Sequence, residues 1–137
     1  MLETTLSSLD GLPAFLAYFA VAIVLVLLFI RIYTWVTPHD ELALIRANNP
    51  AAALAFGGAL IGFALPLSSS ITHSLSVLDC AIWGAVALVV QVLTFLALRF
   101  SLKQLEARIS QGEIASGIFS AAVAVAVGMI NAACMSY

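Results

Sequence analysis

Residues 13–31 read PAFLAYFAVAIVLVLLFIR, and this stretch decides the fold. Positions 13–30 carry no charge, and the run ends at Arg31. An α-helix needs about 20 predominantly apolar residues to cross the hydrocarbon core of a bilayer. The stretch therefore predicts a transmembrane helix over about 13–35. A cleaved signal peptide would begin with a basic region. Because the leader here carries Glu3 and Asp10 and no base, we expect the run to stay in the mature protein.

Three more apolar runs follow, and they predict transmembrane helices over about 51–74, 78–100 and 114–136. Hydrophobic residues make up 64% of the chain and charged residues 9%, whereas a soluble domain carries about 25% charged residues. The apolar excess would have to face water in a soluble protein, so lipid is the better solvent. The sequence predicts an all-α membrane protein with four transmembrane helices, forming a single integral membrane domain over 1–137.

The basic residues occur in two short stretches, each covering the end of the first or third predicted helix and the loop after it: Arg31, Arg46, Arg99, Lys103 and Arg108. Lys and Arg are retained in short cytoplasmic loops, while acidic residues contribute little to orientation. We therefore expect cytoplasmic basic loops and both termini outside, in the periplasm. Tyr33, Trp35 and Trp83 are expected in the headgroup zone, where amphipathic rings settle.

The first basic loop contains a helix-start pattern at Thr37-Pro38-His39-Asp40, in which Thr37 caps and Pro38 takes the first helical position. Leu42 and Ile45 would then share one face of a short helix lying in the interface. The second loop repeats this pattern, with apolar residues Leu102, Leu105 and Ile109 at helical spacing.

The polar residues of the two loops form a candidate surface for a cytoplasmic protein partner or anionic lipid: Asp40, Glu41, Arg46, Lys103, Glu106 and Arg108. The alternative is an ordinary solvated loop that only anchors the topology, because basic juxtamembrane segments are common.

The chain has the pattern of an internal duplication. Sliding it by 64 positions pairs Asn48-Asn49 with Gly112-Glu113 and Gly57-Gly58 with Ala121-Ala122. The repeats, about 13–72 and 77–137, would be parallel helical hairpins about an axis along the membrane normal. Shared small-residue composition could produce the same similarity, so that alternative stays open.

The second and fourth predicted helices are rich in small residues at four-residue spacing: Gly58 and Gly62 in one, and Ser116, Ser120, Ala124 and Gly128 in the other. Small residues let helix backbones approach closely in lipid. We expect these two helices to pack tightly, within one protomer or between protomers. Four spans leave little internal room, so a pore would require a homo-oligomer.

Four segments resemble the YjfL-like bacterial inner-membrane family, domain of unknown function 350, of the UPF0719 type. They are DELALIR at 40–46, AAALAFGGALIGFALPL at 51–67, WGAVAL at 83–88 with Gln91, and GMINAACM at 128–135. The resemblance implies a four-helix, multi-pass protein of the bacterial inner (plasma) membrane with two repeats. It implies no activity, because none is established for the family, and only a loose link to envelope stress. Asn48-Asn49-Pro50 departs from the usual Gly-Asn-aliphatic pattern and is expected to rigidify the entry to the second helix.

Few polar residues fall inside the predicted spans, and they form a candidate intramembrane site: Gln91, Thr94 and Asn131, with Pro66 and the serines Ser68, Ser69 and Ser70. The 64-residue offset predicts that the carbonyl freed by Pro66 lies at the depth of Asn131. A broken helix facing a polar side chain is how transporters build midplane sites. The alternative is that these groups only hold helices together. The lack of an ionisable partner favours this second interpretation.

Near the predicted outer surface, Cys80 and Cys134 are candidates for a disulfide, which needs Cα atoms within about 7 Å. Two free, buried thiols are the alternative. His73 is expected in a loop, and Asp79 as the cap of the third helix. His73, Asp79 and the cysteines lack a recognised metal-ligand spacing, so no metal is predicted.

Enzyme signatures are absent from the sequence: it has no phosphate loop, dinucleotide motif or nucleophile elbow. We therefore expect no enzyme activity and no cofactor. A pI near 5.5 and the lack of a broad basic face argue against nucleic-acid binding. The sequence favours a structural or interaction component of the inner membrane, linked to the cell envelope or membrane stress. The alternative is an oligomeric channel or passive transporter for an ion or small solute.

Overall fold

The computed structural model describes residues 1–36, 41–101 and 104–135. Its elements are α-helices: α1 Leu2–Leu9, α2 Leu12–Val36, α3 Glu41–Arg46, α4 Pro50–His73, α5 Val77–Ser101, α6 Leu105–Ser110 and α7 Ile114–Cys134. Within these described ranges, four helical spans are long and apolar enough to cross a membrane: α1 with α2, α4, α5 and α7. The predicted all-α membrane protein with four transmembrane helices is confirmed.

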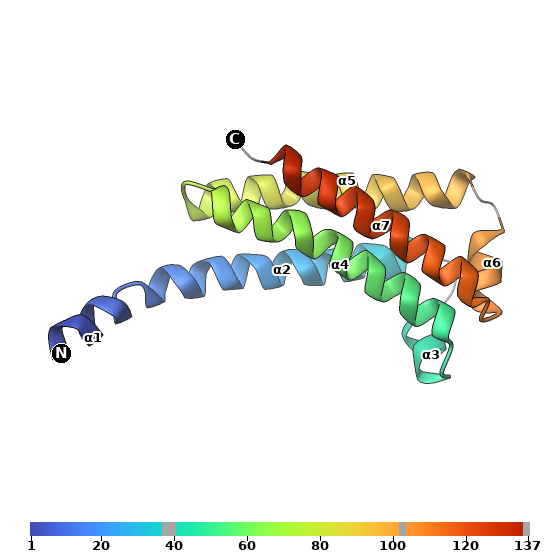
Figure 1. Cartoon of the computed structure of the whole chain (residues 1–137), viewed down its shortest axis with the longest axis horizontal. Coiled ribbons are helices and arrows are strands. Elements are labelled where there is room, and N and C mark those ends of the chain that lie inside the picture. The colour runs from blue at the N-terminus through green and yellow to red at the C-terminus, as the bar shows by residue number, and fades with distance from the viewer. Residues whose placement is uncertain (37–40, 102–103, 136–137) are drawn as a thin grey trace.

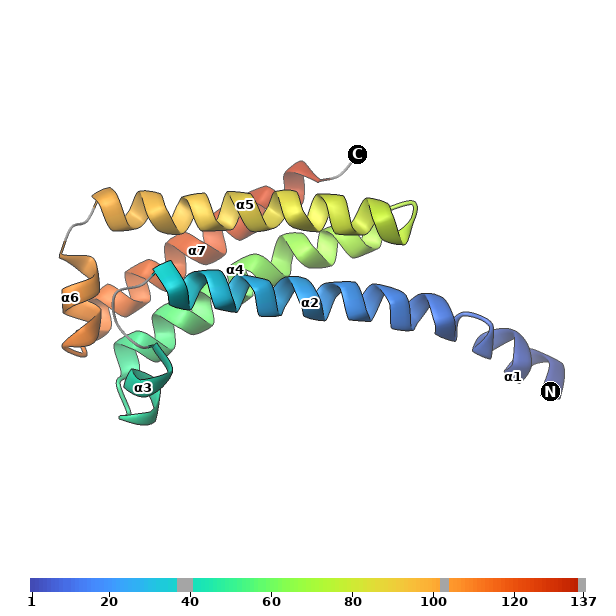
Figure 2. The same ribbon diagram turned by 180° about the vertical axis from the view of Figure 1, so that it is seen from behind.

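The four long helices form two layers, with α4 and α7 crossing in front of α2 and α5 (Figure 1). From behind, α2 and α5 form the near layer (Figure 2). The short helices α3 and α6 lie at one end of the bundle, and both chain termini lie at the other end. The helices α4 and α7 both start at the α3–α6 end, so they run parallel.

Backbone contact between α4 and α7 is the tightest feature of the bundle. A Cβ atom at Gly58 would overlap the Cα and Cβ atoms of Ala121, and a Cβ atom at Gly128 would overlap the Gly62 carbonyl. Small residues therefore set this helix separation, because lipid supplies no hydrophobic drive between helices. The predicted tight packing of these two helices is confirmed within one protomer.

Aromatic rings fill the space between the two layers. Phe29 of α2 stacks on Phe63 of α4 with ring centroids 4.9 Å apart. Tyr33 lies 4.6 Å from Phe95 and 5.4 Å from Phe56, centroid to centroid. Tyr33 is 4% exposed, so its ring packs between helices, and its expected depth in the headgroup zone stays a prediction. Tyr33 follows Phe29 by one helical turn, and α2 continues to Val36, so both rings face the core.

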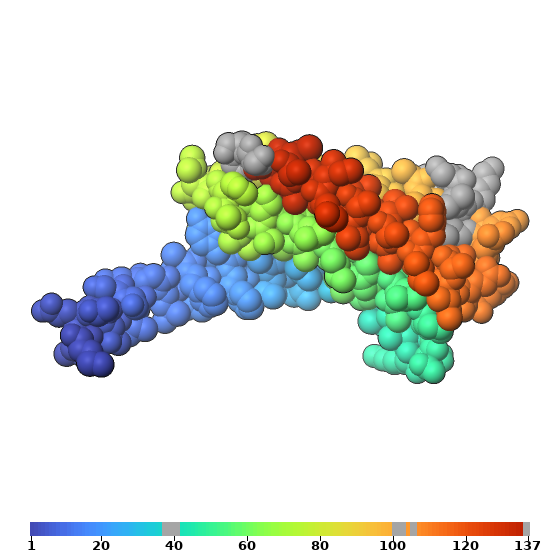
Figure 3. All heavy atoms as spheres, viewed as in Figure 1, coloured from blue at the N-terminus to red at the C-terminus, as the bar shows by residue number. Residues whose placement is uncertain are grey.

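The N-terminal part of the chain projects from the bundle, as the space-filling view shows (Figure 3). The buried residues of α2 all come from its second half, Leu25, Phe29 and Tyr33. The preceding helix α1, which the sequence analysis did not predict, has no buried residue. These N-terminal segments therefore present their apolar side chains to the surroundings of the bundle.

The turns leading into α4 and α7 share one backbone geometry. Asn48 (φ 66°) and Gly112 (φ 82°) both adopt the left-handed conformation, which ends helices α3 and α6. The turn hydrogen bonds recur at the 64-residue offset: Asn49 N to Leu44 O at 2.9 Å and Asn48 N to Ile45 O at 3.0 Å, then Glu113 N to Arg108 O and Gly112 N to Ile109 O, both at 3.0 Å.

The faces through which α4 and α7 pack against each other do not correspond under the 64-residue offset. Gly58 and Gly62 of α4 face α7, whereas their 64-residue counterparts, Ala122 and Ala126, are exposed. The two small-residue helices therefore meet through non-equivalent faces. The internal duplication matches in the turns but not in the packing, and it stays a prediction.

Candidate functional site

Asn49 links the two connectors, the short segments with helices α3 and α6 that join the long helices at one end of the bundle. Its side-chain oxygen accepts the Ala52 backbone N–H at 3.1 Å, which caps the start of α4. Its side-chain nitrogen donates to the carbonyls of Ile109 and Ser110, at 3.0 and 3.1 Å. Those carbonyls belong to the last residues of α6, so one amide bonds backbone groups at two helix ends.

A small apolar core lies beneath this link. Ala51, Ala52 and Ala55 of α4 are buried with Ile109 of α6, and Leu44, Ile45 and Leu98 pack against them. Ile109, which belongs to the predicted apolar side of the second loop, is 5% exposed. Leu42 and Ile45 are three positions apart in the helix α3, so they lie on one side of it as predicted. Leu42 is 47% exposed, and the location of this helix in the membrane interface stays a prediction. Leu44 and Ile45 are the α3 residues that pack against the core. We call α3, α6, Asn49 and this core the connector platform.

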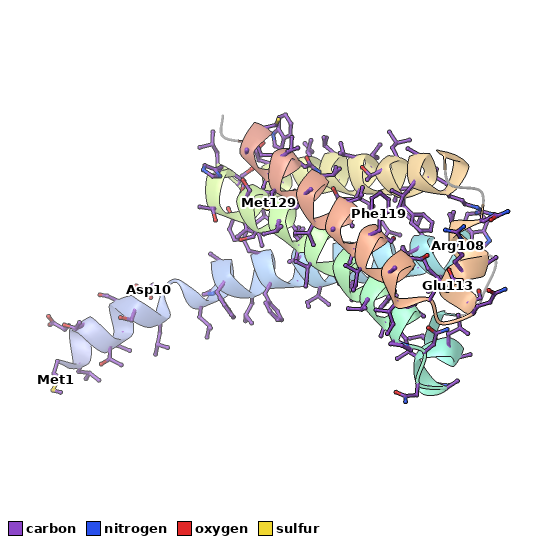
Figure 4. All side chains as sticks on the ribbon, turned by 45° about the vertical axis from the view of Figure 1, so that its right-hand side comes forward. Met1, Asp10, Arg108, Glu113, Phe119 and Met129 are labelled. Atoms are coloured by element: carbon purple, nitrogen blue, oxygen red, sulfur yellow. The ribbon has the colours of Figure 1, made fainter. Side chains whose placement is uncertain are left out.

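The platform carries exposed charges. Arg108 Nε lies 3.8 Å from Glu113 Oε2, with the two side chains 57% and 50% exposed. Figure 4 shows both residues at the connector end and Met1 and Asp10 at the other. Such an exposed pair contributes about 0–1 kcal/mol to stability, so it does little for the fold. Arg46 is also exposed.

Other predicted connector positions lie outside the described residues: Thr37, Pro38, His39, Asp40, Leu102 and Lys103, and the side chains of Glu41, Leu105 and Glu106. Arg99 differs from the exposed bases. Its guanidinium donates to the Val36 carbonyl at the end of α2, where a positive charge also complements the helix dipole.

Two buried amides join α5 to α7. Gln91, which is 3% exposed, donates from Nε2 to the Ala124 carbonyl at 3.4 Å. Asn131, which is 8% exposed, donates from Nδ2 to the Ala87 carbonyl at 3.5 Å. Both bonds are long, so each is a weak tie.

The serines after Pro66 also bond neighbouring helices. The buried Ser70 hydroxyl donates to the Cys80 carbonyl at 2.9 Å, and Ser69 donates to the Ala132 carbonyl at 3.0 Å. Ser68 is exposed. These contacts lie toward the end of α4, away from Gln91.

The structure does not gather the predicted intramembrane set into one site. Pro66 has no N–H, so Gly62 O lacks its usual helical donor, and this carbonyl packs on Gly128. Asn131 lies one helical turn after Gly128 and donates to α5 rather than to this carbonyl. The predicted similar depth of the carbonyl and Asn131 stays a prediction. Only Gln91 and Thr94 come together, beside a cavity of about 20 Å³ that Ser120 also lines. The Thr94 hydroxyl donates to Val90 O of its own helix at 2.9 Å.

The cysteines lie in different environments as free thiols, Cys80 buried and Cys134 exposed. The expectation of two buried thiols is wrong for Cys134, which is the last residue of α7. His73 ends α4 rather than lying in a loop. The predicted capping role of Asp79 needs correction, because the Ser76 hydroxyl accepts the Asp79 N–H at 3.1 Å. Asp79 Oδ2 in turn accepts the Leu75 N–H at 3.0 Å. Ser76 and Asp79 thus both cap the start of α5, in a variant of the capping box in which the acid bonds the N–H one residue before Ser76.

Comparison with known proteins identifies relatives along nearly the whole chain. The family model described as Domain of Unknown Function (DUF350) matches residues 7–135. The UPF0719 inner membrane protein YjfL of Escherichia coli (strain K12) is 43% identical over 129 residues, which cover 94% of this chain and 98% of that protein. The UPF0719 transmembrane protein YshE of Bacillus subtilis (strain 168) is 30% identical over 122 residues, covering 85% of this chain and 89% of that protein. No solved structure matches the chain.

Proposed function

This chain belongs to the DUF350 family of multi-pass inner-membrane proteins, and we propose that it is an interaction protein whose connector platform binds a cytoplasmic protein partner. We propose further that this role belongs to the cell envelope or its response to membrane stress, with which the sequence resemblance implies a loose link. In this role the protein would need no enzyme activity and no cofactor.

The observation that carries the proposal is the joint folding of the two connectors. Asn49 holds the end of α6 against the start of α4 through three hydrogen bonds, and Ile109 is buried between them. Arg46 and Arg108 therefore project from a fixed base. A preformed surface loses less conformational entropy on binding than a loose loop does.

The proposal requires the platform to face the cytoplasm. Arg31 and Arg99 lie near the ends of α2 and α5, and Arg46, Lys103 and Arg108 follow them in the sequence before the next long helix. The positive-inside rule retains such segments in the cytoplasm. Both termini would then be periplasmic. An alkaline phosphatase fused after Tyr137 should be active in whole cells. An inactive phosphatase together with a fluorescent cytoplasmic reporter at the same position would contradict this orientation.

Site-specific photo-crosslinking in cells tests the binding surface. A photoreactive residue at the exposed Ala107 of the platform should give a defined protein adduct, while one at the exposed Leu75 of the opposite end should not. The double variant Arg46→Glu with Arg108→Glu should abolish the adduct, and Arg31→Glu is the matched control outside the platform. An adduct that survives the double charge reversal, or crosslinks to lipid alone, would reject a charge-recognising partner surface.

The second candidate is an oligomeric channel or passive transporter for an ion or small solute. The observation that favours it is the deeply buried Gln91 amide beside a cavity. That cavity holds only about 20 Å³, so a path through the membrane would have to form between copies. Flux across liposomes that falls in Gln91→Leu and Asn131→Leu variants would support this candidate, and flux equal to that of empty liposomes would exclude it.

A further inference from the structure

The Gln91 carboxamide is only half satisfied. Its Nε2 donates to the Ala124 carbonyl, but its Oε1 has no hydrogen-bond partner among the described residues. The side chain is 3% exposed. Buried polar atoms in proteins are almost always bonded to protein or to ordered water, because an unpaired one loses its hydration without replacement.

The orientation of this amide follows from its neighbours. Ala124 offers a carbonyl oxygen, which can only accept, so the group facing it must be the NH₂. Exchanging the nitrogen and oxygen would set two acceptors against each other. Gly62 provides the room, since a Cβ atom there would come within 3.0 Å of Nε2. The unpartnered atom is therefore the oxygen, which needs a donor.

A cavity of about 20 Å³ adjoins this amide. A site needs roughly 10–15 Å³ and two to four polar partners to hold a water molecule. Besides Gln91, the lining includes the hydroxyl residues Thr94 and Ser120. The Thr94 hydroxyl already donates to Val90 O, so its lone pairs are left to accept. Phe29, Tyr33 and Phe95 form much of the remaining wall.

We propose that this cavity is a binding site for one water molecule, which donates to Gln91 Oε1 and bonds the hydroxyl oxygens of Thr94 and Ser120. The water would join α5 to α7 beside the long Gln91–Ala124 bond. The size of the cavity limits the ligand to a single small molecule. The lining residues include no acidic side chain, and an unneutralised cation would lose its hydration there, so the neutral ligand is favoured.

Water-edited solid-state NMR on the full chain in liposomes tests the site. The chain has three glutamines, Gln91, Gln104 and Gln111, and the last two are exposed in the connector region. Labelling glutamine side chains with ¹⁵N therefore gives one test signal, from Gln91, and two control signals from water-exposed side chains. The Gln91→Leu variant assigns the test signal by removing it.

We expect the Gln91 amide to receive water magnetisation at the same short mixing times as Gln104 and Gln111. This early transfer should be lost in the double variant Thr94→Val with Ser120→Ala. The matched control is Ser116→Ala on α7, a buried serine that does not line the cavity. It should keep the transfer.

Absence of early water transfer to Gln91 in the wild-type protein, with normal transfer to Gln104 and Gln111, would overturn the water site. This result does not depend on the folding of any variant. Transfer that persists in the double variant would overturn the assigned hydroxyl partners. The cavity and the core of the connector platform share Leu98, but the NMR and crosslinking experiments report on different residues, so either proposal can fail while the other stands.

Discussion

Replacing Gly58 by Ala should destabilise the bundle, whereas the same replacement at the adjacent Gly57 should not. A Cβ atom at Gly58 would overlap Ala121 at both Cα and Cβ, so the helices α4 and α7 must move apart. A Cβ atom at Gly57 would meet nothing within 4 Å. Both variants gain the same helix propensity, about 1 kcal/mol in soluble helices, so this gain cancels in the comparison.

The difference between the two variants is the cost of overpacking, about 1–3 kcal/mol. We expect the upper half of that range, because the atoms that Gly58→Ala meets include backbone rather than the end of a flexible side chain. Separating the helices there would also loosen the neighbouring contact of Gly62 with Gly128.

Unfolding in mixed micelles with increasing SDS measures this difference. Trp83, which packs against the core, supplies a fluorescence signal for the loss of tertiary structure. Gly58→Ala should unfold at a clearly lower SDS fraction than Gly57→Ala. Equal midpoints for the two variants, or a more stable Gly58→Ala, would refute the argument that backbone contact sets the α4–α7 separation.

Three further outcomes follow from individual contacts. Asn49→Ser keeps a capping oxygen but loses the two bonds donated to α6, so it should lower the free energy of unfolding by about 1–3 kcal/mol. Asn49→Ala should lower it by about 1 kcal/mol more. SDS midpoints equal to that of the wild type would contradict the role of Asn49 at both helix ends. Ser70→Ala should cost about 0.6–2 kcal/mol by removing the bond to Cys80 O, while the exposed Ser68→Ala stays near wild type. Maleimide should label Cys134 in the folded Cys80→Ser variant but reach Cys80 in Cys134→Ser only after unfolding; rapid labelling of both would mean that Cys80 is not buried.

The long helices follow from the sequence because each reflects local composition. Runs of apolar residues of sufficient length leave few alternatives in lipid. The tight pairing of α4 with α7 was also predictable, since the spacing of Gly58 and Gly62 marks a close helix contact. The side of contact was not, because small residues line more than one face of both helices.

Long-range hydrogen bonds could not be derived from the sequence. Asn49 before Pro50 carries a local signal for a helix start, but its two α6 partners lie 60 and 61 positions away. The burial of Tyr33 could not be derived for a related reason, because its partners Phe56 and Phe95 come from other helices. The bond from Asn131 to the Ala87 carbonyl joins residues 44 positions apart, so no local pattern indicates it.

The pairing of α4 with α7 also sets the order of events during biosynthesis. Ser69 of α4 and its partner Ala132 of α7 are 63 positions apart. At about 5–20 residues per second, that interval takes roughly 3–13 s of translation. During this time the glycine face of α4 has left the ribosome and has no α7 to meet. The helix α7, which is made after α4, therefore completes the tightest interface, and a chain truncated before α7 would lack this interface in the membrane.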